Sequence, residues 1–173
     1  MTKYVNLNKR KLPLWMMLVL MVISIAMGWA GCDGQRDPSL AGMEEAYVKR
    51  VVDGDTFITG NDERVRLIGI DAPESVKPDT LPEPYGPEAS AYVKELLEGK
   101  TVYMDVDVSD TDRFDRLLRY IYLADGTFVN EKLLEEGYAR HVVFPPDVAF
   151  EARLRDAENR AKSDGEGLWG LTD

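Results

Sequence analysis

The sequence predicts an α+β domain in which helices pack on a small β-barrel. Three observations favour this class. Short segments rich in β-branched residues are separated by Gly, Asp and Asn turn signals in the first half of the domain, which is typical of a strand meander. Longer amphipathic segments follow in the second half. The chain has 173 residues, of which 45% are hydrophobic, and this suits one globular domain plus an appendage.

Five segments have the length and composition of β-strands. Asp53-Gly54 and Gly60-Asn61-Asp62 provide turns between the first three segments, and Asp71-Ala72-Pro73 ends the third. The sequence Asp125-Gly126 provides a turn after the last. The predicted strands cover residues 46–52, 56–59, 64–70, 101–108 and 117–123.

Three further segments have helical periodicity. In the first, Ala89, Val93 and Leu97 recur on one face, and Gly99 follows the end of the segment. The predicted helices cover residues 88–98, 128–136 and 148–162. The element order is therefore three strands, one helix, two strands and two helices. This is the order of a five-stranded OB-type β-barrel with packed helices.

The beginning of the chain has the pattern of a secretory or membrane signal. Residues 1–11 are polar and basic, and residues 12–31 are almost wholly apolar. This run approaches the length of about 20 residues that spans a bilayer, so an uncleaved anchor is an alternative to a cleaved signal. The basic residues before the run would stay in the cytoplasm and place the rest of the chain outside. Residues 1–32 are therefore predicted to be a signal peptide or a membrane anchor.

The apolar run ends in Ala30-Gly31-Cys32, which resembles the lipobox of bacterial lipoproteins, where lipid is attached to the cysteine. Trp29 departs from the aliphatic residue that is usual there. A lipidated Cys32, an uncleaved anchor and simple secretion therefore stay open. Residues 33–45 contain Gly, Pro and Ser without periodicity and are predicted to be a linker, so the domain should cover residues 46–173.

The charge balance of the chain is acidic. The formal net charge is -10, and after residue 31 there are 17 basic and 31 acidic residues. A protein that grips long nucleic acid usually has a basic face, so this balance argues against such a protein. It is compatible with an enzyme that acts on one phosphodiester through a few cationic side chains and a metal. The single cysteine excludes an intramolecular disulfide, so the domain must depend on its core.

Four short motifs carry the chemistry of the domain. They are V-D-G-D-T at 52–56, V-R-L-I-G-I-D-A-P-E at 65–74, Y-G-P-E-A-S at 85–90 and T-D-R-F-D-R-L-L-R-Y-I-Y at 111–122. Each motif alone is modest. In this order and at these spacings they resemble the thermonuclease family of staphylococcal-nuclease-like proteins, over roughly residues 46–169. The resemblance implies a calcium-dependent nuclease with an OB-type barrel.

Two aspartates are candidate metal ligands. Asp55 and Asp71 stand at the ends of adjacent predicted strands, where two chain reversals could bring their carboxylates together. Clustered carboxylates without a nearby histidine or cysteine form a hard-oxygen site, which suits Ca²⁺ or Mg²⁺ rather than zinc. The resemblance implies that both acids bind Ca²⁺ and that the backbone carbonyl of Ala72 is a further ligand. Taken singly, each aspartate could be an ordinary turn residue.

Three charged residues are candidates for catalysis. The resemblance implies that Glu74, in a loop stiffened by Pro73, is a general base or orients the attacking water. It also implies that Arg66 and Arg116 bind the phosphate oxygens, on which hydrolysis builds negative charge.

Residue type alone leaves alternatives for both arginines. Arg66 could form a salt bridge to one of the two aspartates, which is compatible with the catalytic role. In the segment that contains Arg116, the neighbouring Arg113 and Arg119 are equally plausible until the family register selects Arg116.

Two positions before Arg116 depart from the family pattern, which usually has tyrosine and then glycine. Here they are Phe114 and Asp115. Phe114 can still stack on a base or a ribose, and Asp115 could partly neutralise the arginine. Phe144 is a second candidate for stacking on substrate, whereas His141 is expected to be structural.

These observations predict an extracytoplasmic, membrane-anchored, monomeric nuclease. The resemblance implies that it hydrolyses DNA and RNA at single-stranded or frayed sites and leaves 3′-phosphate ends. A second hypothesis is an anchored OB-fold module that binds nucleic acid or protein without cleaving it. A third is a structural envelope lipoprotein, for which the acidic surface is the argument.

Overall fold

The computed structural model describes residues 36–75 and 83–171. The predicted signal or anchor and its Cys32 lie outside these residues. Within the two described ranges, no helix is both long enough and apolar enough to cross a membrane.

The centre of the fold is a closed β-barrel of five strands. The strands are β1 (Glu44–Asp53), β2 (Thr56–Thr59), β3 (Arg64–Leu67), β5 (Thr101–Asp105) and β6 (Leu117–Tyr122). Around the barrel the order is β1-β2-β3-β6-β5, and β5 pairs with β1 to close it. The β3–β6 pair is parallel, and the other four pairs are antiparallel. The predicted five-stranded OB-type barrel is confirmed.

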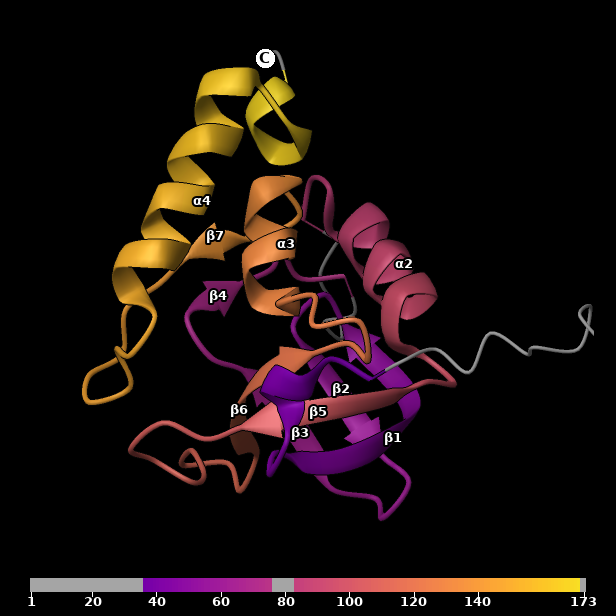
Figure 1. Cartoon of the computed structure of the whole chain (residues 1–173). Helices are drawn as coiled ribbons and strands as arrows, with labels where there is room; N and C mark the ends of the chain where they lie inside the picture. Colours follow the sequence, from indigo (N-terminus) through magenta and orange to yellow (C-terminus); the bar gives the residue numbers. More distant parts are fainter. Residues whose placement is uncertain (1–35, 76–82, 172–173) are drawn as a thin grey trace, which may run out of the picture. The chain divides into compact units, whose positions relative to one another are not determined.

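Three helices gather at one end of the barrel, together with a small second sheet (Figure 1). The helices are α2 (Gly86–Leu97), α3 (Val129–Glu135) and α4 (Glu151–Asp164). The small sheet pairs β4 (Ile70–Asp71) with β7 (Arg140–His141). Two 3-10 turns, η1 (Pro38–Leu40) and η2 (Gly167–Gly170), flank the domain in sequence. The α+β class is therefore confirmed.

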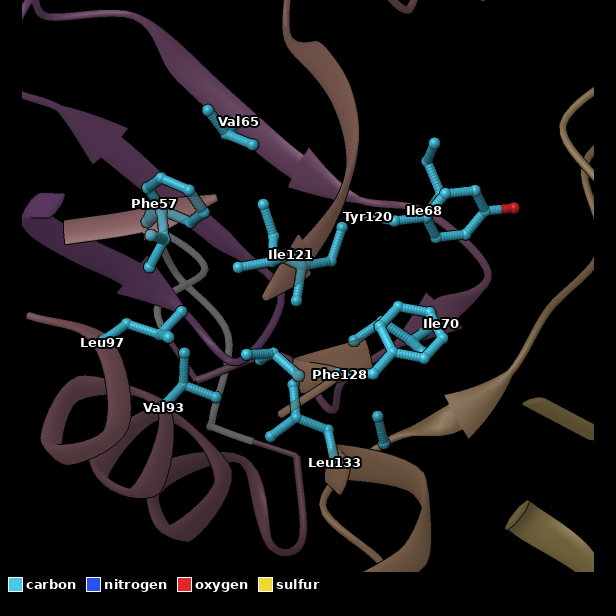
Figure 2. Packing of buried hydrophobic residues seen from close by; sticks show 14 of the residues in the cluster. Phe57, Val65, Ile68, Ile70, Val93, Leu97, Tyr120, Ile121, Phe128 and Leu133 are labelled. Atoms are coloured by element: carbon cyan, nitrogen blue, oxygen red, sulfur yellow. The ribbon is translucent and has the colours of Figure 1, made fainter. Parts of the chain in front are cut away.

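The hydrophobic core joins the barrel interior to the helices. Phe57, Val65 and Ile121 from the strands are fully buried, and Val93 and Leu97 of α2 reach toward them (Figure 2). The register of the strands places these residues on the inner face, while their neighbours point outward. Burial of apolar surface contributes about 25 cal/mol per Å² to the free energy of folding, and in a domain without disulfides it is the main source of stability.

The predicted strand 64–70 is divided in the structure. A turn at Ile68-Gly69 separates β3 from β4, and Gly69 has φ +79°. A Cβ at Gly69 would lie 2.5 Å from a methyl carbon of Leu154, so both the backbone and the packing require glycine. The buried Asn130 fixes the turn, since its Nδ2 donates to Ile68 O at 2.8 Å. The chain therefore leaves the barrel before Asp71, and β4 pairs with β7, which was not predicted.

The other element boundaries shift by a few residues. The strand predicted at 101–108 ends at Asp105, because the chain beyond it forms a loop tied to Asp147. The helix predicted to start at Val148 starts at Glu151. Such end shifts are ordinary for predictions from periodicity.

Residues 36–43, expected to belong to a linker, pack on the barrel. Leu40 is fully buried, and Asp37 N donates to Ala124 O at 2.9 Å. The guanidinium of Arg36 lies 4.3 Å from the ring centroid of Tyr103 on β5. The sequence did not indicate that this segment is packed, because one buried leucine on a 3-10 turn gives no repeating hydrophobic pattern. Strand β1 then begins at Glu44 rather than at Ala46.

Candidate active site

A two-residue turn between β1 and β2 places Asp55 beneath the surface. Its side chain is almost fully buried, and Oδ1 accepts a hydrogen bond from Thr56 Oγ1 at 2.9 Å. Oδ2 accepts from Ala72 N at 3.0 Å. The turn packs tightly, since a Cβ on Gly54 would lie 2.5 Å from Ala72 Cβ. The hairpin thus holds Asp55 against the segment that contains Asp71.

Arg66 joins the two aspartates. It pairs with Thr56 across the β2–β3 ladder, so its side chain starts next to Asp55. Nη1 lies 2.6 Å from Asp55 Oδ2, and Nη2 donates to Asp71 Oδ1 at 2.8 Å. Nη1 does not reach hydrogen-bond geometry, so its contact with Asp55 is a close ion pair rather than a directed bond. The two predicted metal ligands therefore converge on one guanidinium.

The electrostatics of Asp55 follow from its burial. Burial raises the pKa of Asp55 to about 7. The positive charge of Arg66 lowers this pKa in part, and the negative charge of Asp53 raises it further. A buried carboxylate of this kind is stabilised by an added positive charge. When both are ionised, Asp55 and Asp71 outweigh the single positive charge of Arg66, and Asp53 adds a further negative charge nearby.

A hard divalent cation fits this corner. Asp55 and Asp71 have carboxylate oxygens. Ala72, whose N–H donates to Asp55, has a backbone carbonyl oxygen in the same segment. Oxygen donors of this kind suit Ca²⁺, which accepts carbonyls and water beside carboxylates. Within the described residues, no group of three or more Asp, Glu, His or Cys side chains could hold a metal. Asp55, Asp71 and the carbonyl of Ala72 are the candidate donors, and water oxygens would have to complete the coordination of a bound cation.

Arg116 is anchored by Asp112. Nη2 and Nε of Arg116 lie 2.6 and 2.7 Å from Asp112 Oδ2, while Oδ1 accepts from the backbone N–H groups of Phe114 and Arg116. Burial alone would raise the pKa of Asp112, but these hydrogen bonds and the charge of Arg116 lower it below its ordinary value. Asp112 thus stays ionised and fixes the guanidinium in one orientation. The sequence analysis did not select Asp112.

Both predicted arginines and both predicted phenylalanines line one groove of about 460 Å³. The parallel pairing of β3 with β6 brings Arg66 beside the start of β6, which directly follows Arg116. Phe114 is 58% exposed and Phe144 is 67% exposed, so two aromatic faces are open to a ligand. The groove therefore combines guanidinium groups for phosphate with rings for bases or riboses.

Glu74 lies in the loop that follows β4. Its carbonyl accepts from Glu83 N at 2.9 Å, and a Cβ on Gly86 would lie 2.6 Å from that carbonyl oxygen. The start of α2 thus packs directly on the backbone of Glu74. The catalytic role of Glu74 stays a prediction.

The two alternatives to Arg116 differ in position, and only Arg113 stays a candidate for the groove. Arg119 is buried, and its guanidinium donates to the side chain and the carbonyl of Asp110 and to the carbonyl of Leu118, so it ties β6 to the preceding loop. Arg113 lines the groove and lies 4.7 Å from the Phe114 ring centroid. His141 is part of β7, where its N–H donates to the buried Glu158 at 3.0 Å. These contacts are made by the backbone of His141, so the expected structural role of its side chain stays a prediction.

Asp147 is a further residue that sequence reasoning missed. It is buried, lines the groove, and accepts from Val108 N and Ser109 N at 3.1 and 2.7 Å. It thereby holds the loop after β5 against the loop that presents Phe144. An aspartate in a proline-rich loop carries no sequence signal of such a contact.

Asp115 has a left-handed backbone, with φ 58°. We expect Asp115→Gly to raise the free energy of unfolding by up to about 1 kcal/mol, because a non-glycine residue pays a steric cost there. Loss of the negative charge beside Arg116 should also lower KM for a nucleic acid about two- to threefold. Thermal unfolding and initial rates check the two effects.

A matched control for this change is Asp62→Gly. Asp62 has φ 66° and pairs with Lys49 on the outer surface, away from the groove. It tests the backbone effect without the electrostatic one, and Asp115→Asn tests the charge alone. An unchanged KM in both Asp115 variants would show that Asp115 does not act on substrate.

An OB-type barrel whose groove is lined by two arginines and two open aromatic rings, with one of the arginines paired to two aspartates, is the arrangement of a phosphodiester-binding site and is compatible with a nuclease. The family model described as "Staphylococcal nuclease homologue" matches residues 64–170. The chain belongs to this family.

Similar proteins agree with this assignment. The chain is 37% identical to a thermonuclease of Staphylococcus intermedius, over 89% of this chain and 94% of that protein. It is 39% identical to a thermonuclease of Staphylococcus hyicus, over 73% of this chain and 76% of that protein. It is 38% identical to Endonuclease YncB of Bacillus subtilis, over 69% of this chain and 59% of that protein.

Proposed function

We propose that the protein is a monomeric, calcium-dependent nuclease that acts outside the cytoplasm and hydrolyses DNA and RNA at single-stranded or frayed sites. The observation that carries this proposal is the groove. Arg66 lines it from β3 and Arg116 lines it from the residue before β6, and Arg66 is joined to both candidate metal ligands. The relatives named thermonuclease and endonuclease support the same activity.

The arginines would bind the phosphate that is attacked. Asp112 orients the guanidinium of Arg116, so binding needs little reorganisation. Arg66 sits beside the carboxylates, where it can bind a phosphate oxygen next to the cation site. Bound calcium would supply positive charge that polarises the phosphate. Glu74, on the adjoining loop, would orient the water that attacks phosphorus, and the family resemblance implies 3′-phosphate products.

The aromatic rings favour single strands. Phe114 and Phe144 can stack only on bases that have left a duplex, and stacking tolerates every base because each has a π-face. The aspartates that line the groove are already engaged, Asp112 with Arg116 and Asp147 with backbone N–H groups. The groove would therefore bind the phosphates and the flat faces of the bases, and such binding gives weak sequence preference.

The net charge limits the mode of binding. At -10 overall, the protein lacks the charge balance of a long basic footprint. Local contacts at the two arginines must then hold the substrate. This favours action on short, accessible stretches rather than tight association with long duplexes.

The decisive experiment is cleavage of denatured DNA and RNA by the purified, detergent-solubilised chain, with calcium or with excess chelator. Cleavage in calcium and its loss in chelator are expected. The double variant Arg66→Ala, Arg116→Ala controls for a contaminating nuclease. Retention of single strands without cleavage in calcium would instead favour the anchored binding module.

The localisation is tested through Cys32. We expect the full chain in the membrane fraction, and Cys32→Ser should move to the soluble fraction only if Cys32 is lipidated, because the lipid would then be lost with the thiol. An uncleaved anchor helix would keep Cys32→Ser in the membrane, which would overturn lipidation. A soluble parent protein would indicate simple secretion. Fractionation followed by immunoblotting separates these outcomes.

A further inference from the structure

Three tyrosine rings form one column beside the start of α2. The ring of Tyr138 stacks on that of Tyr92 with centroids 4.1 Å apart, and on that of Tyr85 with centroids 5.5 Å apart. The interplanar angles are 12° and 23°. Tyr138 is thus held between two residues of another segment. The three rings lie outside the groove-lining set.

One end of this column adjoins the loop that carries Glu74. Tyr85 is the N-cap of α2, and the next residue, Gly86, packs on the Glu74 carbonyl with no room for a Cβ. Gly86 N donates to Glu83 O, and Glu83 N donates to Glu74 O, both at 2.9 Å. A displacement of Tyr85 is therefore transmitted through the backbone to Glu74.

Tyr138, the central ring of the column, is close in sequence to the strand that pairs with Asp71. Tyr138 follows α3, where its N–H donates to Leu133 O at 2.8 Å. Two residues later, Arg140 pairs with Asp71 in the β4–β7 ladder. The turn that holds Tyr138 therefore continues directly into the strand that positions Asp71.

Tyr85 itself has an unfavourable backbone conformation. Its φ of 69° lies in the left-handed region, which a large side chain rarely adopts without support from its surroundings. Stacking on Tyr138 supplies such support. Without the stack, we expect the backbone at Tyr85 to leave the left-handed region, and the contact between Gly86 and Glu74 would shift with it.

We propose that Tyr138, clamped between Tyr85 and Tyr92, is a positioning residue that fixes the Asp71–Glu74 segment relative to the groove. This inference rests on the proposed nuclease function. Tyr138 acts through backbone that it supports, and it does not touch the substrate. A displacement of about 1 Å in a reacting group can lower a rate about a hundredfold, so a modest shift would be visible in catalysis.

The test compares three variants with one control. Tyr138→Ala removes the stack, and we expect kcat to fall about 10- to 100-fold while KM stays within about twofold. Tyr138→Phe keeps the ring and should keep kcat within about twofold. Tyr122→Ala removes a different stacked ring, 4.8 Å from Phe128, and should lower Tm without changing kcat.

Tyr85→Gly separates positioning from stability. Glycine adopts the left-handed backbone without cost, so this variant should fold with a Tm close to that of the parent or above it. It lacks the ring that stacks on Tyr138, and glycine tolerates the left-handed backbone without fixing it, so the contact between Gly86 and Glu74 should be free to shift and kcat should fall as in Tyr138→Ala. This variant keeps the proposal testable if Tyr138→Ala does not fold.

The outcomes are distinguishable from failure of the proposed function. A parent protein that cleaves no nucleic acid in calcium refutes the function. An active parent with unchanged kcat in Tyr85→Gly and Tyr138→Ala overturns the positioning role, and so does equal loss in Tyr138→Phe and Tyr138→Ala. A second readout is the rise in Tm that calcium produces. It should shrink in Tyr138→Ala and persist in Tyr138→Phe, because Asp71 belongs to the positioned segment.

Discussion

Asp55→Asn is expected to lower calcium-supported cleavage at least about a hundredfold, because it removes one of two carboxylates from the candidate cation site. The amide has nearly the shape of the carboxylate, so Thr56 and Ala72 keep neighbours of the same size. Asp71→Asn should have a similar effect on cleavage, although Asp71 is more exposed than Asp55.

Only a small change in the stability of the metal-free protein is expected from Asp55→Asn. Loss of a buried charge with a raised pKa favours the folded state, whereas loss of the ion pair with Arg66 disfavours it. The two effects oppose each other. The informative measurement is therefore the shift of Tm with calcium, which the parent should show and Asp55→Asn should lack.

Asp62→Asn is the matched control for this prediction. It makes the same chemical change at a surface ion pair with Lys49, and asparagine tolerates the positive φ at that position. It should keep both cleavage and the calcium-dependent shift of Tm. A parent-like rate in Asp55→Asn would exclude this metal site.

Neighbours along the chain or across one hairpin were predictable from the sequence. Asp55 stands in a D-G-D-T turn before β2, and Arg66 is on β3, so the antiparallel β2–β3 register brings them together. Strand and helix patterns alone predicted an α+β domain in which a small barrel was possible, because short strands joined by tight turns leave few topologies, and the family resemblance implied the closed OB-type barrel. The groove could be anticipated through the family resemblance.

Contacts that depend on an irregular loop or on distant segments could not be predicted. The anchoring of Arg116 by Asp112 depends on a loop conformation, and the burial of Leu40 depends on a single side chain. The column at Tyr138 joins α2 to the turn after α3, where neither segment shows a pattern for the other. Local periodicity reports which face of an element is apolar, but it does not report which polar or aromatic groups meet across the fold.

Arg116→Lys is expected to lower kcat about a hundredfold or more, although the positive charge is kept. Asp112 holds the guanidinium through Nε and Nη2 and so sets the direction in which the group faces the groove. An ammonium group has no second nitrogen for this two-point contact. It would pair with Asp112 as a point charge and could not bind two phosphate oxygens in the same plane.

The control for Arg116→Lys is Arg155→Lys on the exposed face of α4, where the arginine pairs with Glu151 one turn earlier. Its kcat and Tm should equal those of the parent. Steady-state kinetics on a short single strand at saturating calcium provide the comparison, and circular dichroism confirms the fold of each variant. A near-normal kcat for Arg116→Lys would show that its fixed guanidinium is not used in the transition state. Arg113, which lines the same groove and lies over Phe114, would then be the next residue to replace, since Arg119 is bound to Asp110.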